Sequence, residues 1–173
     1  QIALAWLVYR LTGSPFMLGL VTFAGNIPIL FLAPFGGVWS DRLNRRRAML
    51  LTQSLSLMQA AVLAGLTFAG QIEVWHLLAA AAFLGVVNAF DTPLRQAFLL
   101  EMVGSRENLP NAIALNSLMM NGSRLIGPAL AGVVLAAAGE AWCFLLNAAS
   151  YLAMLAALAA MRLAAAPAPP SGQ

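Results

Sequence analysis

Residues 36–47 read Gly36-Gly37-Val38-Trp39-Ser40-Asp41-Arg42-Leu43-Asn44-Arg45-Arg46-Arg47. The part from Ser40 to Arg47 is the most polar segment of the chain, and long apolar runs precede and follow it over 16–39 and 48–69. A transmembrane helix needs about 20 apolar residues to cross about 30 Å of hydrocarbon, and both runs meet that length. The polar segment is therefore predicted to be a loop or interfacial segment between two membrane-spanning helices.

The composition of the whole chain agrees with this interpretation. Of the 173 residues, 61% are hydrophobic and 9% are charged, and the mean hydropathy is +0.83. Ordinary soluble domains have about 45–50% apolar and about 25% charged residues, so this chain has too few polar side chains to cover a water-facing globule. Disorder requires low hydrophobicity and high charge. The composition excludes a soluble enzyme domain and a disordered chain, and it predicts an all-α integral membrane protein.

Turn signals and polar segments divide the chain into one partial and five complete membrane helices. Residues 1–11 are too few to cross the bilayer, so we expect them to be the last half of a first helix. Complete spans are predicted over 16–39, 48–69, 74–100, 111–138 and 141–161. Together these helices form one transmembrane bundle over 1–163, and the Pro/Ala-rich residues 164–173 are expected to begin a cytoplasmic linker.

The arginines predict the orientation of the bundle. All nine basic residues are arginine, and placing the 36–47 loop on the cytoplasmic side puts seven of them there. These seven are Arg42, Arg45, Arg46, Arg47, Arg95, Arg106 and Arg162. The outer loops then carry Glu73, His76 and Glu140, as the positive-inside rule requires. The arginines form no continuous basic face, so a nucleic-acid partner is not predicted.

The spacing Gly-x-x-x-Asp-Arg-x-x-Arg-Arg between the second and third helices resembles the signature loop of the major facilitator superfamily. The resemblance implies the amino-terminal six-helix bundle of that fold, built from two inverted three-helix repeats. It also implies that the loop forms a charge network at the cytoplasmic face, which latches the two halves of the transporter in the outward-facing state. By position, the latch residues are Gly37, Asp41, Arg42, Arg45 and Arg46.

From the residues alone, two interpretations of this loop stay open. The arginines can act only as anchors that fix the topology, or they can form the latch. Gly37 is expected to let another helix approach closely, and Asn44 tolerates a left-handed turn. Many superfamily members have Gly in the place of Asn44. A branch of bacterial exporters that includes the enterobactin exporter has Asp or Asn there, and this sequence resembles that branch.

Asp91 lies at the inner end of the fourth span, about 24 Å from Trp75 at 1.5 Å per residue. An ionisable residue is costly there unless it is paired or at a water boundary. The resemblance implies an acid in the fourth helix that meets a loop arginine, so Asp91 is predicted to pair with Arg45. A second interpretation, compatible with the first, is that Asp91 caps a short amphipathic segment that begins at Pro93.

The fifth span contains Gly122-Ser123-Arg124-Leu125-Ile126-Gly127-Pro128-Ala129-Leu130-Ala131-Gly132. Small residues at these spacings allow close helix packing, and Gly-Pro permits a bend. The segment resembles the superfamily's antiporter motif, which ends Gly-Pro-x-x-Gly-Gly and is found mainly in exporters, with Ala131 in place of one glycine. The predicted packing residues are Gly127, Pro128 and Gly132, and the resemblance favours export over uptake.

Arg124 is about halfway along the fifth span. An arginine at the membrane midplane costs at least about 2.5–3.5 kcal/mol. It is therefore expected to face a water-filled cavity, an anionic substrate, or a buried carboxylate in the other half of the protein. Further polar residues within spans are predicted to line the same pathway: Asn26, Asn88, Asn116 and Asn121.

These features predict a fragment of a secondary active transporter of the bacterial cytoplasmic (inner) membrane. The expected activity is proton- or ion-driven export of small molecules such as drugs or siderophores, by alternating access. The expected partners are the lipid bilayer, a small-molecule substrate and a carboxy-terminal six-helix half. An uptake carrier of the same fold and a non-transporting scaffold or receptor stay open as alternatives.

Two further observations limit this prediction. Ala81 stands where many proton-coupled members carry an arginine in the fourth helix, which places proton coupling by that route in doubt. The sequence contains no catalytic pair, phosphate-binding loop or metal-ligand spacing. No enzymatic activity, cofactor or metal is therefore predicted.

Overall fold

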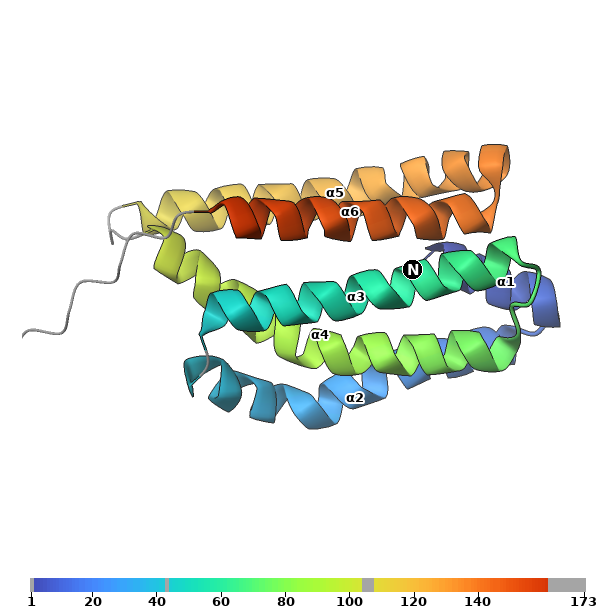
Figure 1. The fold of residues 1–173 in the computed structure, drawn as a ribbon, viewed down its shortest axis with the longest axis horizontal. Coiled ribbons are helices and arrows are strands. Elements are labelled where there is room, and N and C mark those ends of the chain that lie inside the picture. The colour runs from blue at the N-terminus through green and yellow to red at the C-terminus, as the bar shows by residue number, and fades with distance from the viewer. Residues whose placement is uncertain (1, 43, 104–107, 162–173) are drawn as a thin grey trace, which may run out of the picture.

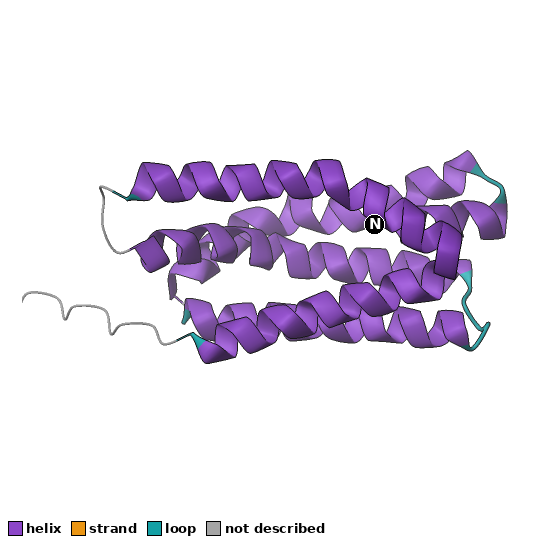
Figure 2. Cartoon of the chain, turned by 90° about the horizontal axis from the view of Figure 1, so that it is seen from above, coloured by secondary structure: helices purple, strands orange, loops and turns teal. Residues whose placement is uncertain are grey.

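The computed structural model describes residues 2–42, 44–103 and 108–161, without the side chains of residues 38–42 and 100–102. All regular secondary structure in these residues is helical, which confirms the predicted all-α fold. The helices run roughly along one axis, and the described turns lie at the two ends of the bundle (Figure 1, Figure 2).

The helices are α1 (Ile2–Thr12), α2 (Pro15–Arg42), α3 (Arg45–Phe68), α4 (Val74–Val103), α5 (Leu109–Ala138) and α6 (Glu140–Ala160). Segments of five of them, α2 to α6, are long and apolar enough to cross a membrane. The loop predicted after the second span is shorter than expected, because α2 continues through Arg42 and α3 begins at Arg45. A helix can extend past the hydrocarbon, since its backbone hydrogen bonds are satisfied internally in either solvent. The predicted linker 164–173 and Arg106 and Arg162 lie outside the described residues.

Helix α4 packs against α2 in the most extensive contact of the bundle, and α3 packs against both α6 and α4. Helix α5 lies beside α6 on the side of the bundle opposite α2, as Figure 1 shows. Helices α1 and α5 share a much smaller contact than α2 and α4 do. Helix α1 has only 11 residues with which to make it. No residue of α5 is buried.

Glycines make the close contact between α2 and α4 possible. A Cβ atom added at Gly85 would lie 2.2 Å from the carbonyl oxygen of Gly25, and one added at Gly36 would lie 2.5 Å from that of Ala89. The second site is next to Pro93, which has no N–H to donate to the carbonyl of Ala89 four residues earlier. Helix α4 changes direction in its second half (Figure 1), and Pro93 explains the bend.

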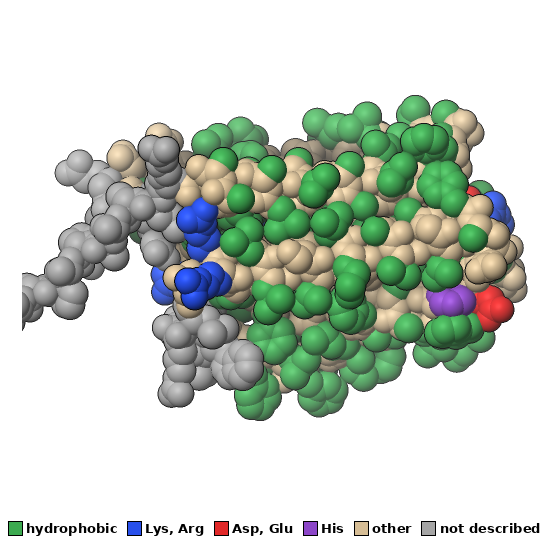
Figure 3. All heavy atoms as spheres, in the orientation of Figure 1, with side chains coloured by type: hydrophobic (Ala, Val, Ile, Leu, Met, Phe, Trp, Pro, Cys, Tyr) green, Lys and Arg blue, Asp and Glu red, His purple; other side chains and the backbone are tan. Residues whose placement is uncertain are grey.

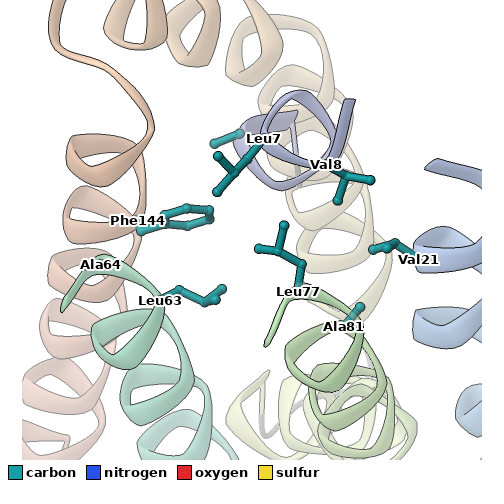
Figure 4. Packing of buried hydrophobic residues seen from close by; sticks show 9 residues of the cluster. Leu7, Val8, Val21, Leu63, Ala64, Leu77, Ala81 and Phe144 are labelled. Atoms are coloured by element: carbon teal, nitrogen blue, oxygen red, sulfur yellow. The ribbon is translucent and has the colours of Figure 1, made fainter. Parts of the chain in front are cut away.

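Two apolar clusters hold the remaining helices together. In the first, Leu7 of α1 lies by Phe144 of α6 and Leu77 of α4, and Val8 lies on the side of Val21 of α2, as Figure 4 shows. The second consists of Met49, Leu94, Phe98 and Leu158, from α3, α4 and α6. Both clusters join residues of the predicted first repeat (α1–α3) to residues of the second (α4–α6), so the described helices pack as one body.

On the face shown in Figure 3, hydrophobic side chains cover the middle of the bundle and charged side chains lie at its two ends. Large exposed hydrophobic side chains include Phe16, Phe23 and Leu30 of α2 and Leu125 and Leu130 of α5. Arg45, Arg46 and Arg47 lie at one end of the bundle, where α3 begins, and Glu73 and His76 lie at the other, where α4 begins. Exposed apolar area of this extent is typical of a protein surrounded by lipid.

Candidate functional site

The residues predicted to form the latch begin where α2 meets α3. Asn44 is the N-cap of α3: its backbone is extended (φ −66°, ψ 104°), and its side-chain oxygen accepts a hydrogen bond from the Arg47 N–H at 3.2 Å. Asn44 therefore caps a helix and does not use the left-handed conformation that asparagine tolerates. The cap fixes the direction in which the following arginines leave the chain.

Arg46 ties this end of α3 to the last turn of α6. Its Nε donates to the carbonyl of Leu158 at 3.0 Å, and its Nη2 donates to that of Ala159 at 2.8 Å. The last carbonyls of a helix have no partner within it, and a cation there also interacts favourably with the helix dipole. Arg45 reaches α4, with Nη1 at 3.4 Å from the carbonyl of Ala97.

The glycine that allows close helix approach is Gly36 and not Gly37. A Cβ atom at Gly37 would meet no described atom within 4 Å, whereas Gly36 lies against α4. Adjacent residues of a helix point about 100° apart, so only one of the two can face a given neighbour. The side chains of Asp41 and Arg42 lie outside the described part of the chain, and the latch stays a prediction.

Asp91 is buried in α4 and forms a polar cluster with α3. Its Oδ1 accepts hydrogen bonds from Thr52 Oγ1 at 2.7 Å and from Gln53 Nε2 at 2.8 Å. Its Oδ2 pairs with Arg95 Nη2 at 3.0 Å, one helical turn along. We call Thr52, Gln53, Asp91 and Arg95 the Asp91 cluster. Both carboxylate oxygens are occupied, as a buried charge requires.

The Asp91 cluster differs from both interpretations of Asp91 made from the sequence. The ion pair of Asp91 is with Arg95, on its own helix, rather than with the predicted Arg45. The cap interpretation is wrong, because α4 is continuous from Val74 to Val103 and Asp91 lies inside it. Thr52 and Gln53 were not predicted. A pattern in the sequence could have identified them: the third span is otherwise apolar but carries polar residues at helical spacing. These are Thr52, Gln53, Ser56 and Gln59, and all four are buried.

Two cavities flank the first residues of α1 and share Ile2, Leu4 and Leu84. One, of about 300 Å³, lies between α1, α2 and α4, and Asn26 and Asn88 line it. The other, of about 420 Å³, is bounded by α1, α3, α4, α5 and α6, and Arg124 lines it with Gln59 and Asn147. We call the second one the Arg124 cavity. The pathway predicted for Asn26, Asn88 and Arg124 stays a prediction: Asn26 and Asn88 line one cavity and Arg124 the other. The sequence analysis did not predict Gln59 and Asn147 as lining residues.

Asn116 and Asn121 line neither cavity, although both were predicted on the same pathway. Asn116 Nδ2 lies 3.7 Å from Met120 Sδ on its own helix, and Asn121 is exposed. Gly127 and Pro128 line the Arg124 cavity. A Cβ atom at Gly127 or Gly132 would meet no described atom within 4 Å. The packing role predicted for these residues therefore has no counterpart among the described helices.

An ion pair links the two repeats at the opposite end of the bundle. Arg10 Nη1 of α1 lies 3.0 Å from Glu140 Oε1, at the start of α6, and the Glu140 side chain is only 8% exposed. The sequence placed Glu140 in an outer loop and gave Arg10 no partner. Since Arg10 is in the last turn of α1 and Glu140 in the first turn of α6, each charge also suits the dipole of its own helix.

Polar cavities within a bundle of membrane-length helices are typical of membrane transport proteins. The chain belongs to the transmembrane secretion effector family of the major facilitator superfamily, whose family model matches residues 1–170. Members of this superfamily are transporters and not enzymes.

Similar proteins include transporters with named substrates. The chain is 34% identical over 152 residues to the staphyloferrin A transporter of Staphylococcus aureus, covering 87% of this chain and 38% of that protein. It is 26% identical over 172 residues to the multidrug efflux pump Tap of Mycolicibacterium fortuitum, covering 97% and 42%. It is 23% identical over 134 residues to macrolide efflux protein A of Streptococcus pyogenes, covering 78% and 33%. The chain spans less than half the length of these relatives, and no solved structure matches it significantly.

Proposed function

We propose that the complete protein is a secondary active transporter that exports small molecules across the bacterial cytoplasmic membrane by alternating access. The observation that carries the proposal is the Arg124 cavity. Arg124, midway along a membrane-length helix, lines a cavity bounded by five helices, and the residue is exposed in this structure. A scaffold protein has no use for such a costly residue, whereas a transporter needs polar groups along its pathway.

Relatives support export over uptake. Two of the similar proteins are named as efflux proteins, while the name of the staphyloferrin A transporter states no direction. We therefore propose export and keep an uptake carrier of the same fold as the second candidate. In this proposal the arginine-rich end of the bundle faces the cytoplasm.

Direction is tested with the full-length protein in inverted membrane vesicles. Vesicles energised with a proton gradient are expected to accumulate ethidium, and a protonophore is expected to abolish the accumulation. Accumulation in right-side-out vesicles alone would show uptake instead. Absence of ethidium accumulation in vesicles of both orientations would favour a scaffold.

The latch is tested by Asp41→Asn in the same assay. Removing the charge should lower the initial rate about tenfold, since coupling free energies between conformational states are typically about 1–3 kcal/mol. Membrane insertion should be unchanged, because the arginines that set the topology remain. Glu73→Gln is the matched control, since it neutralises an acid at the opposite end of the bundle and should transport normally. A fully active Asp41→Asn protein would exclude the latch role.

A further inference from the structure

Arg124 has no protein partner in the described part of the chain. Its guanidinium makes no hydrogen bond or ion pair with any described residue, although it lies midway between residues 109 and 138 of α5. Arginine stays charged under all physiological conditions and has five N–H groups to satisfy. An apolar side chain or lipid tail placed against it would leave those donors unpaired, at a cost of several kcal/mol. Whatever fills the space next to Arg124 must therefore bring an acceptor.

The Arg124 cavity is suited to a negative ligand. Four of its lining side chains can donate hydrogen bonds, those of Gln59, Arg124, Asn147 and, more weakly, Cys143, and no carboxylate is among the residues that line it. Gln59 is 8% exposed, and its Nε2 has one long hydrogen bond of 3.5 Å, to the carbonyl of Ala80. Asn147 is exposed in this structure. The groups that face the cavity thus combine one full positive charge with amides that can donate or accept.

The remaining wall of the cavity is apolar. Leu63, Leu84 and Phe144 contribute most of the larger side chains, and Pro128 and Ala131 complete the α5 side. A volume of about 420 Å³ is within the range of small-molecule sites. An inorganic anion would leave most of this wall without a contact, whereas a molecule with an apolar body and one charged group would use both parts.

We propose that the Arg124 cavity binds amphipathic carboxylates, with the carboxylate held by the guanidinium of Arg124 and the apolar body against Leu63, Leu84 and Phe144. This inference rests on the proposed transport function and names the substrate class of the same site. The planar fork of a guanidinium matches a carboxylate through two parallel hydrogen bonds, a geometry that lysine cannot reproduce. Asn147 and Gln59 supply further donors for the ligand.

Cys143 provides a direct reporter, because it lines the same cavity and is the one cysteine of this sequence. The experiment uses the full-length protein in proteoliposomes, with any cysteine outside this sequence replaced by serine. Cys143 is modified with two methanethiosulfonates of similar size, the anionic 2-sulfonatoethyl reagent and the cationic 2-(trimethylammonio)ethyl reagent. The thiolate itself favours the cationic reagent, so each rate is divided by the rate of the same reagent with free 2-mercaptoethanol. The ratio of these normalised rates, used below, reports the charge of the cavity.

The anionic reagent is expected to react roughly tenfold faster than the cationic one, as one partly solvated charge nearby requires. The ratio should fall to about one in Arg124→Gln and stay unchanged in Arg124→Lys. Arg47→Gln is the matched control. It removes an exposed arginine from the first turn of α3 and should leave the ratio unchanged. Bound 2-naphthoate should slow the modification of wild type, while the neutral 2-naphthamide should not. This protection should weaken in Arg124→Lys and vanish in Arg124→Gln.

Three results would overturn the proposal. Equal rates in wild type, with a preference for the cationic reagent in Arg124→Gln, would show that a carboxylate elsewhere in the protein already neutralises Arg124. A Cys143 that reacts with neither reagent, nor with neutral methyl methanethiosulfonate, would show that protein fills the cavity. If Cys143 reacts faster with the anionic reagent but 2-naphthoate does not slow its modification, amphipathic carboxylates would be excluded as the ligand class. The ethidium assay is independent of these measurements, so failure of the carboxylate site and failure of the transport function are distinguishable.

Discussion

Asp91 shows how a single carboxylate is kept within a membrane bundle. Its two oxygens accept two hydrogen bonds from α3 and form an ion pair with Arg95. The Arg95 side chain is about half exposed, so the compensating positive charge lies near the surface. The Asp91 cluster therefore fixes α3 against α4 by electrostatics as well as by packing.

We predict that Asp91→Asn destabilises the protein by about 1–3 kcal/mol. The amide removes the ion pair and turns an NH₂ group toward donors, which leaves buried polar groups unsatisfied. Thermal unfolding of the purified full-length protein in detergent measures the effect. Arg95→Gln is also expected to destabilise the protein, because it leaves the buried Asp91 carboxylate without its ion-pair partner. Equal stability of Asp91→Asn and wild type would show that the cluster does not hold the helices.

At the scale of elements, the contact between α2 and α4 depends on positions without side chains. Gly85 lies against the backbone of Gly25, and Gly36 lies against the carbonyl of Ala89. Small residues let membrane helices approach closely, because lipid provides no hydrophobic force to bring them together. The contact is less tight at Gly25, where an added Cβ atom would lie 3.4 Å from the carbonyl oxygen of Ala81.

Gly85→Ala is expected to destabilise this contact by about 1–3 kcal/mol, the usual cost of overpacking. The added methyl group would lie 2.2 Å from a backbone carbonyl oxygen, so a whole helix must shift. Gly65→Ala is the matched control in α3, since its Cβ atom would meet nothing within 4 Å. The control should be neutral or slightly stabilising, because alanine favours helices. Unfolding by sodium dodecyl sulfate compares the two, and equal effects would contradict the close contact.

The sequence predicted the helices well and their contacts poorly. Runs of about 20 apolar residues and breaks such as Thr12-Gly13-Ser14-Pro15 depend on local composition, which is why six helices were expected where six are found. Partners depend on which face of each helix turns inward, and an apolar helix has little contrast between its faces. For this reason the sequence pointed to Gly37 rather than Gly36 as the site of close helix approach, and to Arg45 rather than Arg95 as the partner of Asp91. It also gave no indication that Glu140 pairs with Arg10.

Over the whole molecule, charge is divided unequally between the two ends. The described arginines of α3 lie at one end, and Glu73, His76 and the Arg10–Glu140 pair lie at the other. Basic residues close to helix ends are retained on the cytoplasmic side during insertion. The whole bundle is therefore expected to have a single orientation.

This orientation is tested by cysteine labelling of the full-length protein in intact cells, in a Cys143→Ser background. A membrane-impermeant maleimide is expected to label Gln71→Cys, in the turn between α3 and α4, without permeabilisation. It should label Asn108→Cys, at the start of α5, only after the cells are broken. The reverse pattern would mean that the arginine-rich end faces outward.

The hydrogen bonds of Arg46 to the last turn of α6 also have a mechanical consequence. Arg46 is the second residue of α3, whose N-cap Asn44 is close in sequence to the end of α2. It binds the carbonyls of Leu158 and Ala159 just before α6 ends. A force applied to the part of the chain that follows α6 would act first on these two hydrogen bonds. Through Arg46 it would then reach the junction of α2 and α3. The bundle therefore contains a short path for tension between its final helix and the loop on which the latch is proposed.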